Sequence, residues 1–146
     1  MKSSLGQFLA FTFLFLASYA VIAQDADAIV GEWYTTEKDA KVEIYKENGK
    51  YNGKITWLEQ PTENGKPILD AKNSDKSKRD RKILGMELLE GFEFKNGTWE
   101  NGTIYDPTNG KTYSCTLKKK NNKTLEVRGY IGISLVGRTV EWTKVK

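Results

Sequence analysis

The chain has 146 residues, with 23 Lys and Arg against 19 Asp and Glu, and a formal net charge of +4. This length suits one domain, and a small positive surplus mixed with acidic residues gives no reason to expect nucleic-acid binding. The sequence contains no histidine and a single cysteine, Cys115. These two facts exclude Ser-His-Asp and Cys-His catalysis, His-ligated zinc or haem sites, and an intramolecular disulfide.

The N-terminal segment predicts export. A short, weakly basic start, residues 1–4, precedes an uncharged apolar run over residues 5–22, and Ala23 supplies a small residue for cleavage. This pattern is typical of a secretory signal peptide spanning residues 1–23. The alternative is a transmembrane anchor, because the run lies at the lower limit of length for crossing a bilayer. We expect cleavage, no stable membrane insertion, and a protein of the periplasm or the extracellular space.

The remaining residues, 24–146, are expected to form one domain, whose barrel spans residues 28–146. Apolar and polar side chains alternate there with a period of two, between short turn signals, which predicts β-strands joined by hairpins. The expected strands lie near residues 29–36, 41–47, 51–57, 83–94, 99–105, 113–118, 125–128 and 138–143. Asn-Gly pairs at 48–49 and 96–97 are strong hairpin signals, because both central positions of a type I′ turn need positive φ. Eight such strands form either a sandwich or a closed barrel, and sequential hairpins favour an all-β, antiparallel, up-and-down barrel.

Two segments interrupt this alternation. Residues 60–82 are long, polar and charged, and they include a basic run over residues 76–82. Connections of this length in compact domains are usually functional or mobile. Residues 131–136 are instead apolar and glycine-flanked, so we expect them to fold across one mouth of the barrel.

Several short motifs occur in an order that resembles a known family. They are Ile29-Val30-Gly31-Glu32-Trp33, Tyr51-Asn52-Gly53-Lys54-Ile55-Thr56-Trp57-Leu58, Asp70 with Asn73, Leu84-Gly85, Gly102-Thr103-Ile104-Tyr105-Asp106-Pro107, Gly110-Lys111-Thr112-Tyr113, Leu125-Glu126-Val127-Arg128-Gly129-Tyr130, Leu135-Val136-Gly137-Arg138-Thr139 and Trp142. The family is the exported bacterial domain of unknown function 2147, and the resemblance covers essentially the whole domain. It implies a lipocalin-like, calycin-type barrel exported in bacteria, with no catalytic residues to transfer.

The first strand also resembles the Gly-x-Trp signature of lipocalins, through Gly31 and Trp33. In that fold the Trp closes one end of the barrel, and an Arg from late in the chain lies across its indole. Arg138 shares a face with the apolar Val140, so alternation points it inward, and closure makes the first and last strands neighbours. We expect a structural clamp between Trp33 and Arg138, a cation–π pair worth roughly 2 kcal/mol. The alternative places Arg138 at the rim, extended into water.

The sequence offers little catalytic or metal-binding chemistry. The glutamates of the expected strands take the polar parity of a solvated outer face, and Cys115 takes the apolar parity of a buried small hydrophobe. The spacing of Asp70, Asn73 and Asp75 raises the question of calcium, but the ligand order of a calcium loop is missing. Turn-forming and capping roles suit these three residues better. We expect no enzyme activity, no cofactor and no metal.

The face that alternation directs inward carries large or soft apolar side chains and a few polar groups. Its members are Tyr51, Trp57, Met86, Phe92, Phe94, Thr103, Tyr105 and Tyr113. Such a lining is typical of a small-molecule site, although the same side chains equally suit a solidly packed barrel. We expect a monomer that binds or transports a small apolar or amphipathic ligand in the cell envelope. The alternative is an interaction protein that contacts a partner or an anionic envelope surface through residues 76–82 and 131–136.

Overall fold

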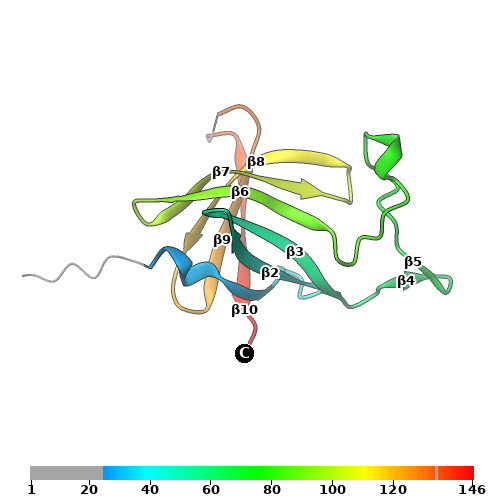
Figure 1. The fold of residues 1–146 in the computed structure, drawn as a ribbon, viewed down its shortest axis with the longest axis horizontal. Helices are drawn as coiled ribbons and strands as arrows, with labels where there is room; N and C mark the ends of the chain where they lie inside the picture. The colour runs from blue at the N-terminus through cyan, green and yellow to red at the C-terminus, as the bar shows by residue number, and fades with distance from the viewer. Residues whose placement is uncertain (1–24, 134) are drawn as a thin grey trace, which may run out of the picture.

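The computed structural model describes residues 25–133 and 135–146, and the expected signal peptide lies outside this part of the chain (Figure 1). Ten strands and two short 3-10 helices follow one another within these described residues. They are η1 (Ala26–Ile29), β1 (Gly31–Tyr34), β2 (Ala40–Glu47), β3 (Lys50–Leu58), β4 (Thr62–Glu63), β5 (Lys66–Pro67), η2 (Lys76–Lys78), β6 (Glu87–Lys95), β7 (Thr98–Asp106), β8 (Lys111–Lys119), β9 (Thr124–Tyr130) and β10 (Gly137–Lys144). Among the described residues, no helix is long and apolar enough to cross a membrane.

Eight of these strands close into one antiparallel barrel in the order β1-β10-β9-β8-β7-β6-β3-β2. The predicted all-β, up-and-down barrel is therefore confirmed, and the sandwich alternative is wrong. Both predicted Asn-Gly turns have positive φ at each central position, with 51° and 76° at Asn48 and Gly49 and 50° and 85° at Asn96 and Gly97. Tight turns of this kind are what permit neighbours in sequence to be neighbours in the barrel.

One end of the barrel is plugged by η1, which lies at the left in Figure 1. The indole Nε1–H of Trp33 donates to the carbonyl of Ile29 at 2.8 Å, and that of Trp99 donates to the carbonyl of Ala26 at 2.9 Å. Both indoles are fully buried. A buried indole needs a hydrogen-bond acceptor, so these two side chains fix η1 across the opening while filling the space beneath it.

Tyr51 supplies a third link to the plug. Its hydroxyl donates to Oδ1 of Asp27 at 2.5 Å, and Lys46 Nζ lies 3.3 Å from the same carboxylate. The hydrogen bond from Tyr51 and the charge of Lys46 lower the pKa of Asp27, whereas burial and the Asp27 carboxylate raise the pKa of Tyr51. We call this plugged side the closed end.

The other end of the barrel is surrounded by the connections over residues 35–39, 59–86, 107–110 and 131–136. The longest of them runs outside the barrel wall and contains the small β4–β5 hairpin and η2 (Figure 1). Asp75 caps η2 by accepting from the backbone N–H of Ser77 at 3.0 Å, which confirms a capping role for this residue. We call this side the open end.

Candidate functional site

A cavity of about 710 Å³ opens at the open end of the barrel. Its floor is apolar and comes from four of the barrel strands, β6, β7, β9 and β10. The floor residues are Leu88, Ile104, Val127, Gly129, Val140 and Trp142. Ligand pockets in proteins commonly enclose about 300–1,000 Å³ with a largely apolar lining. In size and lining, the open half of the barrel is suited to a small molecule.

The space above the floor exists partly because position 129 has no side chain. A Cβ built on Gly129 would lie 3.6 Å from Cγ2 of Ile104 and 3.7 Å from Cβ of Tyr113, which are ordinary van der Waals distances. A methyl group therefore fits at this position, and anything larger extends into the cavity. Gly129 is in this way a natural point at which the volume of the cavity can be changed.

The rim of the cavity carries polar side chains with charges of both signs, beside the apolar Ile131 and Val136. Arg138, at the mouth end of β10, is exposed and lines the cavity, as do Glu37, Asp39 and Asp106. The hydroxyl of Tyr113 accepts a hydrogen bond from Nδ2 of Asn109 at 2.9 Å. An apolar floor below a polar rim matches the two ends of an amphipathic molecule.

Only part of the predicted site lies at this cavity. Tyr105 and Tyr113 line it, whereas Thr103 lines a neighbouring cleft. The floor residues were missed, although the alternation of β9 and β10 had already directed Val127, Val140 and Trp142 inward. Alternation identifies the face of a strand but not the level along the barrel axis, and the prediction favoured aromatic residues over aliphatic ones.

Four predicted ligand contacts are instead packing residues of the core. Tyr51, Met86 and Phe92 are buried, and Phe94 is half-buried with its ring centroid 4.9 Å from that of Trp99. None of these four lines the cavity described above. The structure therefore places these four residues in the core of the closed half and not at this cavity, as the packed alternative describes.

Trp57 points away from the barrel interior. Its side chain is 38% exposed and packs edge-on against Tyr34, with ring centroids 6.3 Å apart. The register between β2 and β3 shifts here, pairing Val42 with Ile55 but Lys41 with Trp57. Thr56 is thus an extra residue that reverses the alternation, and the prediction of Trp57 as a ligand contact is wrong for that reason.

A second shift of register changes the faces of β7. Trp99 pairs with Leu117, and Gly102 with Cys115, so two residues between them oppose one on β8. Asn101 has a positive φ of 60° at this point. Beyond the bulge, Gly102 and Ile104 take the inward face. Thr103 and Tyr105, which sequence alternation had directed inward, take the outer face.

Tyr105 accordingly holds the long connection to the barrel wall. Its hydroxyl donates to Oδ1 of Asp70 at 2.6 Å, and Oδ2 of Asp70 accepts from Asn73 Nδ2 and from Arg81 Nε, both at 2.8 Å. Asp70 is completely buried. Burial raises the pKa of Asp70, but the hydrogen bonds from Tyr105, Asn73 and Arg81 outweigh it, and the net pKa lies below the ordinary value. We call these four residues the Asp70 hub.

The predicted clamp between Trp33 and Arg138 is wrong in its cation. The register of β1 and β10 places Lys144 opposite Trp33, and Lys144 Nζ lies 4.9 Å from the centroid of that indole. Arg138 pairs with Gly129 at the other end of β10 and is exposed. The alternative position of Arg138 at the rim is the one observed. Arg138 lines the cavity, as its inward parity predicted, but it lies at the opposite end of β10 from the residue that pairs with Trp33.

A second cleft of about 590 Å³ lies between the barrel wall and the long connection. It is lined mainly by polar and charged side chains, among them Asp75, Lys78, Arg81, Glu90 and Lys111. Tyr105, Tyr113 and Ile131 border this cleft as well. The cleft and the cavity therefore meet at the open end, on either side of the same few residues.

The single thiol of the sequence lies away from this region. Cys115 is buried in the core, and burial raises the pKa of its thiol to about 12. Within residues 25–133 and 135–146, no group of three or more potential Cys, Asp or Glu ligands gathers in a way that suits a metal ion.

The family of the chain follows from a match over nearly the whole barrel. Residues 31–144 match the family described as an uncharacterized protein conserved in bacteria, DUF2147. The chain belongs to this family. The predicted resemblance is thereby confirmed, and among curated proteins no match was found.

One solved structure shows how this family member compares in fold. Protein HP1028 from the human pathogen Helicobacter pylori, described as belonging to the lipocalin family, superposes with a TM-score of 0.71 at 22% sequence identity. The match covers 81% of this chain and 83% of the other. At this identity the likeness concerns the fold alone, and it confirms that the barrel is lipocalin-like.

Proposed function

We propose that this protein is a non-catalytic carrier or sensor of a small apolar or amphipathic molecule in the bacterial envelope. The observation that carries the proposal is the cavity of about 710 Å³ with its apolar floor. An apolar surface that is left open to water is costly in a domain without a disulfide, because it forfeits the free energy of burial. A ligand that fills the space provides a reason for it.

The lining favours an amphipathic ligand over a purely apolar one. The tail of such a molecule would lie against Val127, Val140 and Trp142, and its polar group would reach the rim. Arg138 is the basic residue that lines the cavity, and its exposed position leaves its charge close to water. An anionic group at the rim would gain a charge-assisted hydrogen bond there.

The composition of the cavity supports binding without chemical turnover. The chain has no histidine, and the thiol of Cys115 is protonated in the core at neutral pH. Tyr105 and Asp70, which form a close hydroxyl–carboxylate pair, are engaged in holding the long connection. The export pattern at residues 1–23 supports a location in the periplasm or outside the cell.

Native mass spectrometry of the protein purified from its own host envelope tests the proposal directly. We expect a co-purifying small molecule that is released on unfolding. Titration with fatty acids and isoprenoids should then change the emission of Trp142, which is 4% exposed and lies at the cavity floor. Absence of both a bound mass and an emission change would refute the carrier function.

Matched variants locate the bound molecule. Trp142→Phe should abolish most of the emission change, whereas Trp57→Phe should preserve it because Trp57 lies outside the barrel. Gly129→Val should lower ligand affinity tenfold or more by filling the cavity, while Gly129→Ala, which fits at ordinary contact distances, should lower it less. Equal affinity in all four variants would place the ligand elsewhere.

A further inference from the structure

Four large apolar side chains are exposed together at the open end. Ile131 is 68% exposed, Ile133 63%, Leu135 85% and Val136 64%. Backbone hydrogen bonds hold this turn, from Ile131 N–H to the carbonyl of Val136 and from Val136 N–H to that of Ile133. Single exposed apolar residues are common, but contiguous ones mark a contact surface. We call these four residues the apolar rim.

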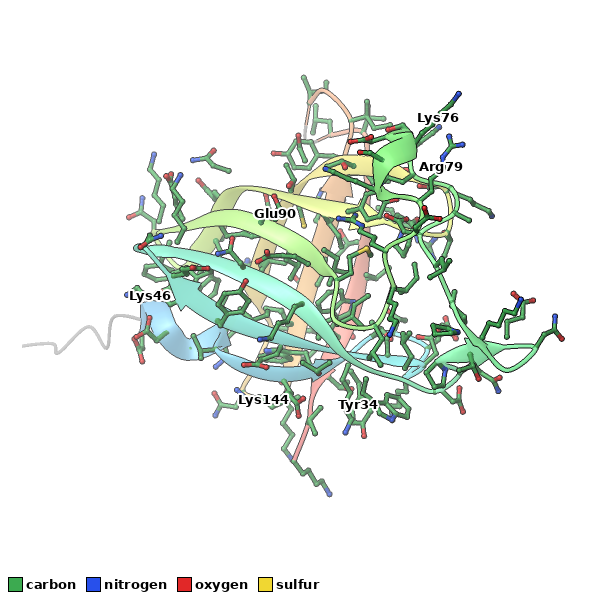
Figure 2. All side chains as sticks on the ribbon, turned by 45° about the vertical axis from the view of Figure 1, so that its right-hand side comes forward. Tyr34, Lys46, Lys76, Arg79, Glu90 and Lys144 are labelled. Carbon is green, nitrogen blue, oxygen red and sulfur yellow. The ribbon has the colours of Figure 1, made fainter. Side chains whose placement is uncertain are left out.

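The long connection contains a segment whose net formal charge is strongly positive. Residues 72–82 contain six basic and two acidic side chains, so this segment alone has a formal charge of +4, equal to that of the entire chain. Lys76 and Arg79 project from η2 away from the barrel wall (Figure 2). We call residues 72–82 the basic segment.

The apolar rim and the basic segment border the same surface. Lys78 and Arg81 line the second cleft together with Lys111 and Ile131. In Figure 1 the turn between β9 and β10 lies at the top of the view, and η2 lies at the upper right, beside the barrel. The cleft also contains three acidic residues. Asp75 accepts from Ser77, Glu87 accepts from the hydroxyl of Tyr45, and Glu90 is exposed.

The Asp70 hub fixes the position of this charge. Arg81 is bound to the buried carboxylate of Asp70, Arg79 Nε donates to the carbonyl of Asn73 at 2.7 Å, and Lys72 Nζ donates to the carbonyl of Thr108 at 2.8 Å. The basic segment is therefore attached to the barrel beside the apolar rim. Lys76, Lys78 and Lys82 remain exposed on its surface.

We propose that the open end docks on an anionic phospholipid bilayer, with the apolar rim inserted among the lipids and the basic segment against their headgroups. Apolar side chains flanked by Lys and Arg are the combination that holds proteins at a lipid interface. Negative surface charge attracts each nearby basic residue by about 1 kcal/mol, a factor of about five in affinity. Ile131 and Val136 also line the cavity, so docking would place the mouth of the cavity at the lipid surface.

Flotation of the ligand-free protein with lipid vesicles tests this proposal. Vesicles of phosphatidylglycerol and phosphatidylcholine in equal parts should carry the protein upward, and vesicles of phosphatidylcholine alone should leave it behind. Raising the salt concentration should weaken the binding, because salt screens the attraction of the basic segment. Equal binding to both kinds of vesicle, or none to either, would overturn the proposal.

Variants separate the two parts of the surface. Lys76→Glu combined with Lys78→Glu should reduce vesicle binding tenfold or more, and Leu135→Asp should do the same without altering the basic segment. The matched controls are Lys95→Glu with Lys118→Glu and Val30→Asp, which change exposed residues at the closed end. Circular dichroism and thermal melting establish that each variant is folded. Equal losses in the controls would show that the open end is not the docking surface.

These experiments distinguish a failure of the docking proposal from a failure of the proposed ligand binding. Gly129→Val alters the cavity floor but neither the apolar rim nor the basic segment, so it should bind vesicles like the unmodified protein while its ligand affinity falls. A protein partner in place of a bilayer would leave purified protein unbound to every vesicle, which refutes the proposal.

Discussion

Lys144 Nζ lies over the indole of Trp33 and also donates to the carbonyl of Val30 at 3.2 Å. A residue of the last strand thus covers the tryptophan of the first, at the point where the barrel closes. Because Trp33 is fully buried and its Nε1–H is bound to Ile29, the lysine completes a contact that begins inside the core and ends at the surface.

Lys144→Ala should destabilise the protein by about 0.5–1 kcal/mol, the range of a partly exposed cation–π pair. Arg138→Ala should cost less than about 0.5 kcal/mol, because exposed side chains outside such contacts contribute little. Urea denaturation of both variants measures the difference. A larger loss for Arg138→Ala than for Lys144→Ala would contradict the assignment of the clamp to Lys144.

Tyr105→Phe should reduce the free energy of unfolding by about 1–3 kcal/mol, since it removes one donor from a buried carboxylate. Faster proteolysis between residues 66 and 82 should accompany the loss, because Tyr105 links this connection to the barrel wall. Tyr113→Phe is the control, as its hydroxyl accepts from Asn109 at an exposed position. Protection of the connection in Tyr105→Phe equal to that in the unmodified protein would disprove the linking role.

Asp70 should make the protein sensitive to acid. Its pKa in the folded state lies below the ordinary value of 3.8, so the ionised carboxylate contributes its full stability above that pH and loses it as pH falls through the lower folded value. In Asp70→Asn, the slope of unfolding free energy against pH should therefore be shallower below about pH 4. The measurement is a series of urea titrations at several acidic pH values. Asp75→Asn, at an exposed site, should change that slope less.

Gly102→Ala should cost about 1–3 kcal/mol through overpacking. A Cβ at Gly102 would lie 2.4 Å from Cγ of the buried Phe92 ring, so the ring or the strand must shift. Gly129→Ala, which introduces the same methyl group at the cavity, should be nearly neutral. Thermal unfolding distinguishes the two, and similar melting temperatures would mean that the closed half is not tightly packed around Phe92.

Period-two alternation and two Asn-Gly turns were sufficient to predict the barrel, because both are local signals. The predicted site was less accurate because the prediction took no account of two β-bulges. The extra residue at Thr56 sends Trp57 outward, and that before Gly102 turns Tyr105 toward the long connection. Thr56 gives no sequence signal of its bulge, whereas Asn101 and Gly102 form an Asn-Gly pair, a turn signal that the strand prediction did not use.

The sequence also did not predict which inward-facing residues line the cavity and which pack in the core. Tyr51 and Phe92 point inward as predicted, but they pack beneath η1 rather than at the open end. Their level depends on how far each strand is offset from its neighbours. That offset becomes definite only when the barrel closes.

The separation of a packed half from an open half divides the evolutionary constraints on the chain. Replacements at Trp33 or Trp99 disturb the plug and the folded state together. Replacements at Ile104, Val140 or Arg138 reshape or recharge the cavity while leaving the plug intact. Under the proposed carrier function, single substitutions at the cavity can therefore change the preferred ligand without unfolding the protein.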